Sequence, residues 1–130
     1  MRRVLMAALV YWGGVFAAAF VIGAGRTLWL APRIGALAAV AMEVPVVLAI
    51  SLFAARAAVQ HWRLGPRSAG AMGAAAFVLL MAAEWALAQA FGQSSAEWLA
   101  AMQTAPGVLG LAGQVGFGAM PWVASRFGEA

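Results

Sequence analysis

The sequence predicts an all-α integral membrane protein, a four-helix bundle whose N and C termini both lie in the cytoplasm. Of its 130 residues, 65% are hydrophobic and only 9% are charged, whereas soluble domains carry about a quarter charged residues. The hydrophobic residues form four long apolar runs. All eight basic residues are arginines, and they flank these runs, as the charges that orient membrane proteins do.

The apolar runs cover about residues 4–24, 35–55, 69–91 and 105–124, within a single domain of residues 1–130. Each approaches the ~20 residues that a helix needs to cross the hydrocarbon layer. Helices are expected because backbone groups inside lipid must pair within their own segment. The opening Met1-Arg2-Arg3 is also typical of a signal peptide. We expect an uncleaved first span instead, since the apolar run is too long and three more follow.

The orientation follows from the arginines that lie between the apolar runs. With both termini in the cytoplasm, the outer side holds only Arg26 and Arg33. The cytoplasmic side then holds Arg2, Arg3, Arg56, Arg63, Arg67 and Arg126. Six arginines against two favour this arrangement.

The two outer connections differ in character. Residues 23–35 are too apolar for a free loop, and we expect them to lie along the lipid headgroups with Trp29 as an anchor. In the second connection, Glu97 follows Ser94 by three residues, the spacing of a capping box, which predicts a short surface helix. Thr104 is expected to cap the fourth span.

Five polar residues are expected to form a cluster toward the outer side of the bundle: Arg26, Arg33, Glu43, Glu84 and Gln114. Both glutamates and the glutamine lie inside apolar runs, ~10–12 Å below the outer interface at helical rise. A charge at mid-bilayer costs roughly 2.5–3.5 kcal/mol on insertion scales, so each carboxylate should be paired, protonated or in contact with water.

Arg26 or Arg33 is expected to pair with Glu43, because an arginine and a carboxylate can share two charge-assisted hydrogen bonds. Pro45 lies nearby in the same run. Because proline has no N–H, the carbonyl of Ala41 is left without its helical donor, which makes this stretch of helix irregular and polar. Two interpretations of Glu43 stay equally open: an ion pair that only locks the bundle, and a transport or binding role. For Glu84, packing is favoured.

Four glycines of the fourth run are spaced three apart: Gly107, Gly110, Gly113 and Gly116. Small residues let helix backbones approach each other closely in lipid. They predict either packing within one bundle or a contact between copies of the chain.

The residue inventory argues against an enzyme. Without cysteine, the chain has no disulfide, iron–sulfur or thiol chemistry. The single histidine, His61, offers no metal cage. No serine is placed beside a histidine as a nucleophile, and no phosphate-binding glycine loop occurs. The arginines are dispersed rather than gathered into a patch for nucleic acid. We therefore expect no catalytic residue, cofactor, metal or nucleic-acid partner.

Several segments resemble a family of small uncharacterised bacterial inner-membrane proteins with four transmembrane helices. They are residues 25–35 (GRTLWLAPRIG), Glu43-Val44-Pro45, Ala54-Ala55-Arg56, Ala83-Glu84, Glu97-Trp98-Leu99-Ala100 and Ala119-Met120-Pro121. The resemblance touches most of the chain and implies a multi-pass protein of the bacterial inner membrane, with no activity attached. The family often carries an Arg-Asp pair near residues 102–105, which this sequence lacks. Small multidrug transporters differ by an essential glutamate in the first span, and small fluoride channels by an Asn- and Phe-bearing signature.

Two functions remain in view. The first is a structural or accessory membrane protein that lies in the lipid bilayer and packs with itself or with a membrane protein partner. The second is a small proton- or cation-coupled transporter or channel that uses Glu43.

Overall fold

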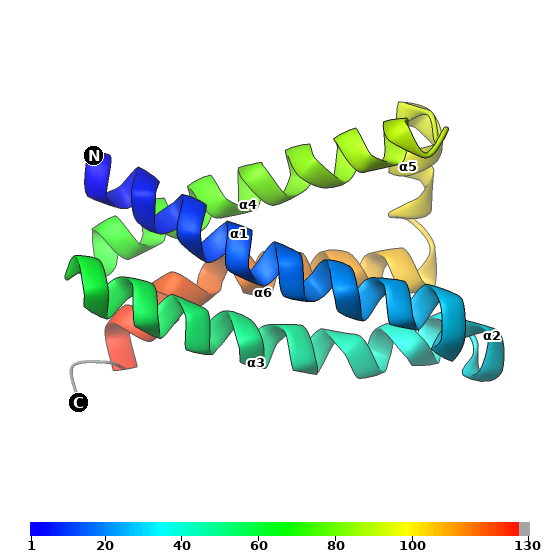
Figure 1. The fold of residues 1–130 in the computed structure, drawn as a ribbon, viewed down its shortest axis with the longest axis horizontal. Coiled ribbons are helices and arrows are strands. Elements are labelled where there is room, and N and C mark those ends of the chain that lie inside the picture. The colour runs from blue at the N-terminus through cyan, green and yellow to red at the C-terminus, as the bar shows by residue number, and fades with distance from the viewer. Residues whose placement is uncertain (128–130) are drawn as a thin grey trace.

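The structure, a computed structural model, describes residues 1–127 and is helical along almost all of that length (Figure 1). The all-α fold is therefore confirmed. In chain order the elements are α1 (Arg2–Gly25), the π-helix η1 (Arg26–Leu30), α2 (Ala31–Ile34), α3 (Ala36–Trp62), α4 (Pro66–Ala90), α5 (Ser95–Ala101) and α6 (Ala105–Phe127).

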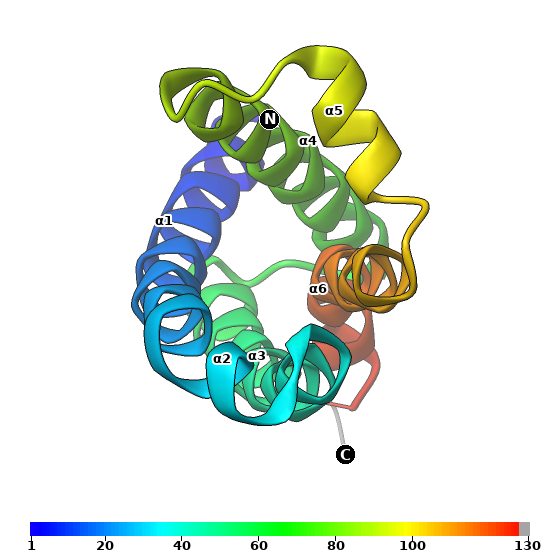
Figure 2. The same ribbon diagram turned by 90° about the vertical axis from the view of Figure 1, so that its right-hand side faces the viewer.

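The four long helices form a ring in the order α1, α3, α6, α4, which is visible when the bundle is viewed along its length (Figure 2). Helices α1 and α4 run in one direction, and α3 and α6 run in the other (Figure 1). The beginning of α1 and the end of α6 consequently lie at the same end of the bundle. Both η1–α2 and α5 lie at the opposite end.

Four helical segments are long and apolar enough to cross a membrane: Arg2–Ile34, Ala36–Trp62, Pro66–Ala90 and Ala105–Arg126. Large apolar side chains point outward along them, and Val21, Phe53 and Val78 are each more than half exposed. So much exposed apolar surface suits hydrocarbon better than water. The chain thus has the architecture of a multi-pass membrane protein.

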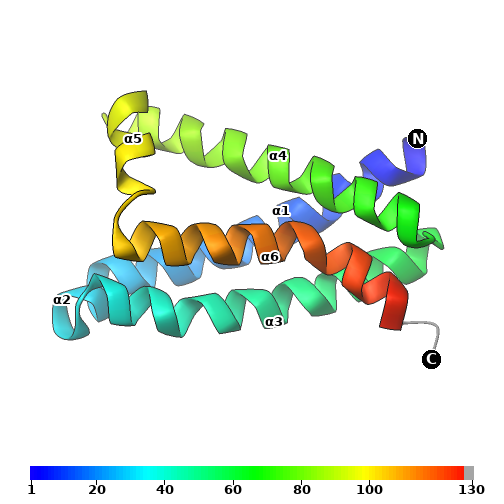
Figure 3. The same ribbon diagram turned by 180° about the vertical axis from the view of Figure 1, so that it is seen from behind.

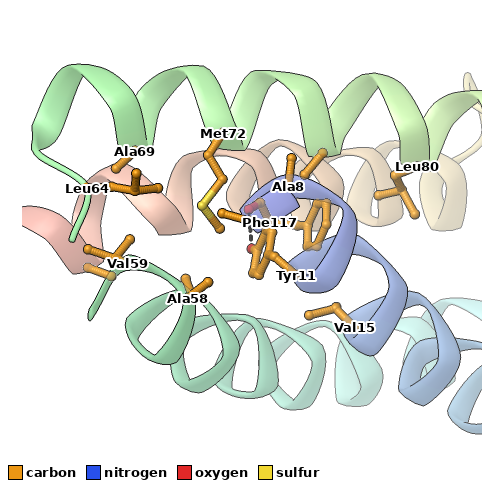
Figure 4. Packing of buried hydrophobic residues seen from close by; sticks show 14 residues of the cluster. Ala8, Tyr11, Val15, Ala58, Val59, Leu64, Ala69, Met72, Leu80 and Phe117 are labelled. Atoms are coloured by element: carbon orange, nitrogen blue, oxygen red, sulfur yellow. Dashed lines mark hydrogen bonds between the residues drawn. The ribbon is translucent and has the colours of Figure 1, made fainter. Parts of the chain in front are cut away.

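The core is packed most tightly toward the end where the chain begins. Tyr11, Met72 and Phe117 fill its centre, with fully buried alanines from all four long helices around them (Figure 4). Two of these long helices approach closely at Gly73 of α4 and Gly118 of α6, where an added Cβ on Gly73 would collide with the Gly118 carbonyl oxygen. Small residues thus bring these two helices together, as is common in lipid.

Helix α6 contains Pro121 and bends near it (Figure 3). Proline has no N–H, so the Phe117 carbonyl lacks its usual α-helical donor. The Tyr11 hydroxyl of α1 donates a hydrogen bond to this carbonyl oxygen at 2.5 Å, and the two rings stack with centroids 4.6 Å apart (Figure 4). A side chain from another helix therefore replaces the donor that proline removed.

The first outer connection is helical, and its expected place along the lipid headgroups stays a prediction. Residues 26–34 are helical as η1 and α2, and the chain turns only at Gly35, where φ is +91°. The run contains no residue that breaks a helix, since Pro32 falls in the first turn of α2, where it is tolerated. Keeping the helix also keeps its backbone groups paired.

The remaining local predictions concern helix ends and glycines. The capping box of α5 is confirmed: the Ser94 hydroxyl accepts from the Glu97 N–H, and the Glu97 carboxylate accepts from the Ser94 N–H. Thr104 caps α6 by accepting from the Gly107 N–H at 3.2 Å.

Two of the four spaced glycines of α6 pack against α3. A Cβ added to Gly113 would lie 3.2 Å from Val44 Cγ1, and one added to Gly116 would lie 2.8 Å from Leu48 Cδ2. Packing inside one bundle therefore accounts for these two glycines. A contact between copies of the chain stays a prediction.

Candidate functional site

Two polar pairs face each other across the end of the bundle that carries η1 and α5. In the first, the Arg26 guanidinium forms an ion pair with the Glu43 carboxylate. Arg26 opens η1, and Glu43 lies on the second turn of α3. Their side chains are 30% and 16% exposed, so the pair is only partly withdrawn from solvent or lipid.

Gly23 lies directly beside this ion pair. A Cβ built there would be 3.5 Å from Arg26 Nη2 and 3.9 Å from Glu43 Oε1. The π-helix that starts at Arg26 widens the chain at the same point. Such segments are rare and are found frequently at functional sites.

The second pair joins α4 to α6. The Gln114 side-chain amide donates a hydrogen bond to Glu84 Oε2. Both side chains are partly buried, and both point inward rather than toward the outer surface of the bundle. A neutral amide therefore faces Glu84, whereas a full positive charge faces Glu43.

Both pairs line one half-open cavity of about 400 Å³, whose wall comes from the four long helices and α5. This volume lies within the range of pockets that hold small organic molecules. Its apolar lining includes Phe16, Leu80, Trp98, Met102, Leu111 and Phe117. The cavity is thus largely apolar, with two carboxylates, one guanidinium and one amide in its wall.

The cavity contains an excess of negative groups. Among the described residues, the ionisable side chains in its wall are Arg26, Glu43 and Glu84. Arg26 balances Glu43, which leaves Glu84 as a carboxylate with a hydrogen bond but no countercharge in contact. An ionised Glu84 would give the cavity a net charge of one negative unit.

Helix α5 reaches from α4 toward the start of α6 (Figure 2), and its residues Trp98 and Ala101 line the cavity. Ser95 fastens it to α4, since the Ser95 hydroxyl oxygen accepts from Trp85 Nε1 at 2.9 Å and from Gln89 Nε2 at 3.0 Å. The capping box holds its first turn. There the Ser94 backbone N–H, and then the Ser94 side chain, lower the pKa of the Glu97 carboxyl below its usual range.

A second recess lies behind the ion pair, between the end of α1 with η1 and the start of α3. It measures about 470 Å³, and Trp29, Leu30 and Met42 contribute to its apolar wall. Arg26 and Glu43 line this recess as well as the inner cavity. The ion pair therefore contributes to the walls of both hollows.

The structure brings four of the five predicted cluster residues to one cavity: Arg26, Glu43, Glu84 and Gln114. Arg33 lies elsewhere. Its guanidinium donates to the Trp29 carbonyl at 2.8 Å and stacks over the Trp29 ring at 4.6 Å. Because residues 26–34 are helical, Arg33 is one turn from Trp29 and is kept beside it. Of the two arginines expected as partners of Glu43, Arg26 therefore forms the ion pair.

Sequence reasoning missed two contributors to this region. The aromatic wall from Phe16 and Phe117 could not be separated from ordinary apolar packing by spacing alone. The contact of Tyr11 with the Phe117 carbonyl had a signal: a proline inside a span, together with the only tyrosine of the chain in another span.

No protein-family model, curated protein or solved structure matches this chain.

Proposed function

We propose that the chain is a multi-pass protein of a bacterial inner membrane that binds a small organic cation in the inner cavity, in exchange for a proton on Glu84. The observation that carries the proposal is the cavity that reaches Glu84, a carboxylate with no cation in contact among residues 1–127. Both termini lie in the cytoplasm in this proposal, supported by the six arginines near that end of the bundle.

Because of the charges around each carboxylate, we assign the proposed cation-binding role to Glu84 rather than to Glu43. Glu43 is held by Arg26, so a cation at Glu43 would have to displace a guanidinium. Glu84 is held by the Gln114 amide, which is neutral and can turn aside or accept a second partner. An intramembrane carboxylate without a fixed countercharge favours a proton or a bound cation.

The apolar lining defines the kind of cation. Phe16, Trp98 and Phe117 line the same cavity as Glu84, and aromatic faces attract quaternary ammonium groups. A small inorganic cation would instead need several oxygen ligands. An ammonium that carries apolar substituents therefore suits this wall better than a metal ion.

The second candidate is the structural or accessory role. It is favoured by the way the polar pairs connect the helices: Arg26–Glu43 joins the end of α1 to α3, and Glu84–Gln114 joins α4 to α6. In that case the same residues would govern stability alone. The isosteric change Glu84→Gln separates the two candidates, because it should weaken cation binding in the first and affect only stability in the second.

The test is binding of benzyltrimethylammonium to the detergent-purified protein, measured by titration calorimetry at two pH values. We expect wild-type protein to bind with proton release, more tightly at the higher pH. Glu84→Gln should weaken binding by roughly 10- to 100-fold, because it removes the carboxylate that faces the cation.

Glu97→Gln is the matched control, since it removes an exposed carboxylate on α5, outside the cavity wall. It should bind like wild type. Equal affinity in wild type and Glu84→Gln, or no binding by folded wild-type protein, would overturn the proposed function. Lower thermal stability of Glu84→Gln with no such binding in wild type would support the structural candidate.

A further inference from the structure

A third hollow lies at the other end of the bundle, between the end of α3 and the end of α6. It measures about 260 Å³. Its polar wall consists of Arg56, Gln60, Arg63 and Ser125, and apolar side chains from both helices complete it. It shares no lining residue with the inner cavity, so nothing in this inference depends on the proposed function.

The three longer polar side chains come from one face of α3. Gln60 follows Arg56 by four residues and Arg63 follows Gln60 by three, the spacing of neighbours on a helix surface. Arg63 ends the helix in a left-handed conformation with φ of +53°. The Leu64 N–H donates to the Val59 carbonyl at 3.0 Å, and Leu64 is buried. The helix end that carries Arg63 is therefore fixed.

Two positive charges face this hollow, and no described carboxylate does. Glu43, Glu84 and Glu97 all lie toward the opposite end of the bundle, and Glu129 lies outside the described residues. Arg56 is six residues before the end of α3 at Trp62, which places it ~9 Å inward along the helix axis. Arg56 and Arg63 are both exposed near this end of α3, where basic side chains attract anionic lipid headgroups.

The end of a helix is itself slightly negative, which opposes an anion here. Two features outweigh this effect. Arg3 Nη1 donates to the Trp62 carbonyl at 3.2 Å and so satisfies one of the terminal carbonyls of α3. Two full positive charges also exceed the half charge of a helix end.

We propose that this hollow, the Arg56–Arg63 hollow, binds the phosphate group of an anionic phospholipid. Both guanidiniums can donate to phosphate oxygens, and guanidinium–phosphate pairs are among the strongest hydrogen-bonded contacts. The Gln60 amide supplies a further donor. Ser125 lines the hollow but offers no donor to a ligand, since its hydroxyl donates to the Trp122 carbonyl at 2.7 Å. A lipid is the favoured source because basic pockets between membrane helices commonly hold anionic headgroups.

The test uses protein purified without lipid in a non-ionic detergent and then titrated with dioleoylphosphatidylglycerol, with the retained lipid counted by native mass spectrometry. Wild-type protein should retain phosphatidylglycerol in preference to dioleoylphosphatidylcholine. The double variant Arg56→Gln/Arg63→Gln should bind phosphatidylglycerol about 30-fold more weakly, since each arginine near an anionic headgroup adds a similar increment.

Arg67→Gln is the matched control, because Arg67 is exposed at the same end of the bundle but does not line the hollow. It should bind like wild type. The variant Arg56→Lys/Arg63→Lys keeps both charges but loses the guanidinium geometry, so it should bind less tightly than wild type and more tightly than the double glutamine variant, which separates a lost site from a misfolded protein.

Equal retention by wild type and the double glutamine variant would overturn the site. Equal retention of phosphatidylcholine and phosphatidylglycerol by wild type would overturn the anionic assignment. Binding of inorganic phosphate by wild-type protein that retains no phosphatidylglycerol would overturn the lipid source and identify soluble phosphate as the ligand.

Discussion

Replacing Tyr11 by Phe removes a single hydroxyl from the centre of the bundle. That hydroxyl donates to the Phe117 carbonyl at 2.5 Å, and Tyr11 is 1% exposed. The phenylalanine ring can keep the stacking on Phe117, whose ring lies 4.6 Å away and within 7° of parallel. The change therefore isolates the hydrogen bond.

The expected cost of Tyr11→Phe is about 1–2 kcal/mol of unfolding free energy. A buried acceptor left without a donor costs ~1–3 kcal/mol in water-soluble proteins, and hydrogen bonds between membrane helices reach ~1.7 kcal/mol. The upper part of the membrane range applies because Pro121 has already removed the alternative donor within α6.

Pro121→Ala supplies the second arm of the experiment. Alanine at this position restores a backbone N–H for the Phe117 carbonyl, so Tyr11→Phe should cost ~0.5 kcal/mol or less in that background. The double-mutant cycle should then show a coupling of about 1 kcal/mol. Equilibrium unfolding in detergent micelles, followed by tryptophan fluorescence, measures all four proteins. An equal cost of Tyr11→Phe in both backgrounds would refute the idea that the hydroxyl replaces the missing donor.

Two further predictions concern helix packing and the cap of α5. Gly73→Ala should destabilise the bundle by about 2–4 kcal/mol, because its Cβ would collide with the Gly118 carbonyl oxygen. Gly70→Ala on the same helix meets only a Trp side chain at 3.8 Å and should be neutral or stabilising in the same unfolding assay. Ser94→Ala should raise the Glu97 pKa part of the way toward its ordinary value, as followed by carboxyl NMR titration, since it removes the Ser94 side chain and keeps the Ser94 N–H, which lowers that pKa more. Because the folded pKa is depressed, the cap should hold at neutral pH and be lost as the pH falls through that lowered pKa; an unchanged Glu97 titration in the variant would contradict this.

The helical framework could be predicted from the sequence because its signals are local. Apolar length predicts a membrane helix wherever it occurs, and all four long helices appear. The capping box at Ser94 and the cap at Thr104 depend on neighbours within one turn. Such features do not need knowledge of how the helices are arranged.

The connection after α1 shows what local reasoning left open. Apolar residues between two spans can form a surface loop or extend a helix, and composition alone does not separate the two. The chain is helical up to Ile34, which keeps its backbone groups paired and avoids the cost of unpaired backbone in lipid. That outcome also placed Arg33 beside Trp29 and left Arg26 to reach Glu43.

Partners across helices were harder to predict, since they depend on rotation and depth together. Depth alone placed Glu43, Glu84 and Gln114 in one layer, and the structure divides them between two pairs. A proline leaves a helical carbonyl without its donor at Pro121 as well as at Pro45. Only the arrangement of α1 against α6 shows that the Tyr11 hydroxyl supplies the missing donor near Pro121.

The ion pair formed by Arg26 and Glu43 has a geometric consequence for the two hollows beside it. The same two side chains line the inner cavity and also the recess between α1 and α3. A substitution that removed either side chain would therefore alter the walls of both hollows together.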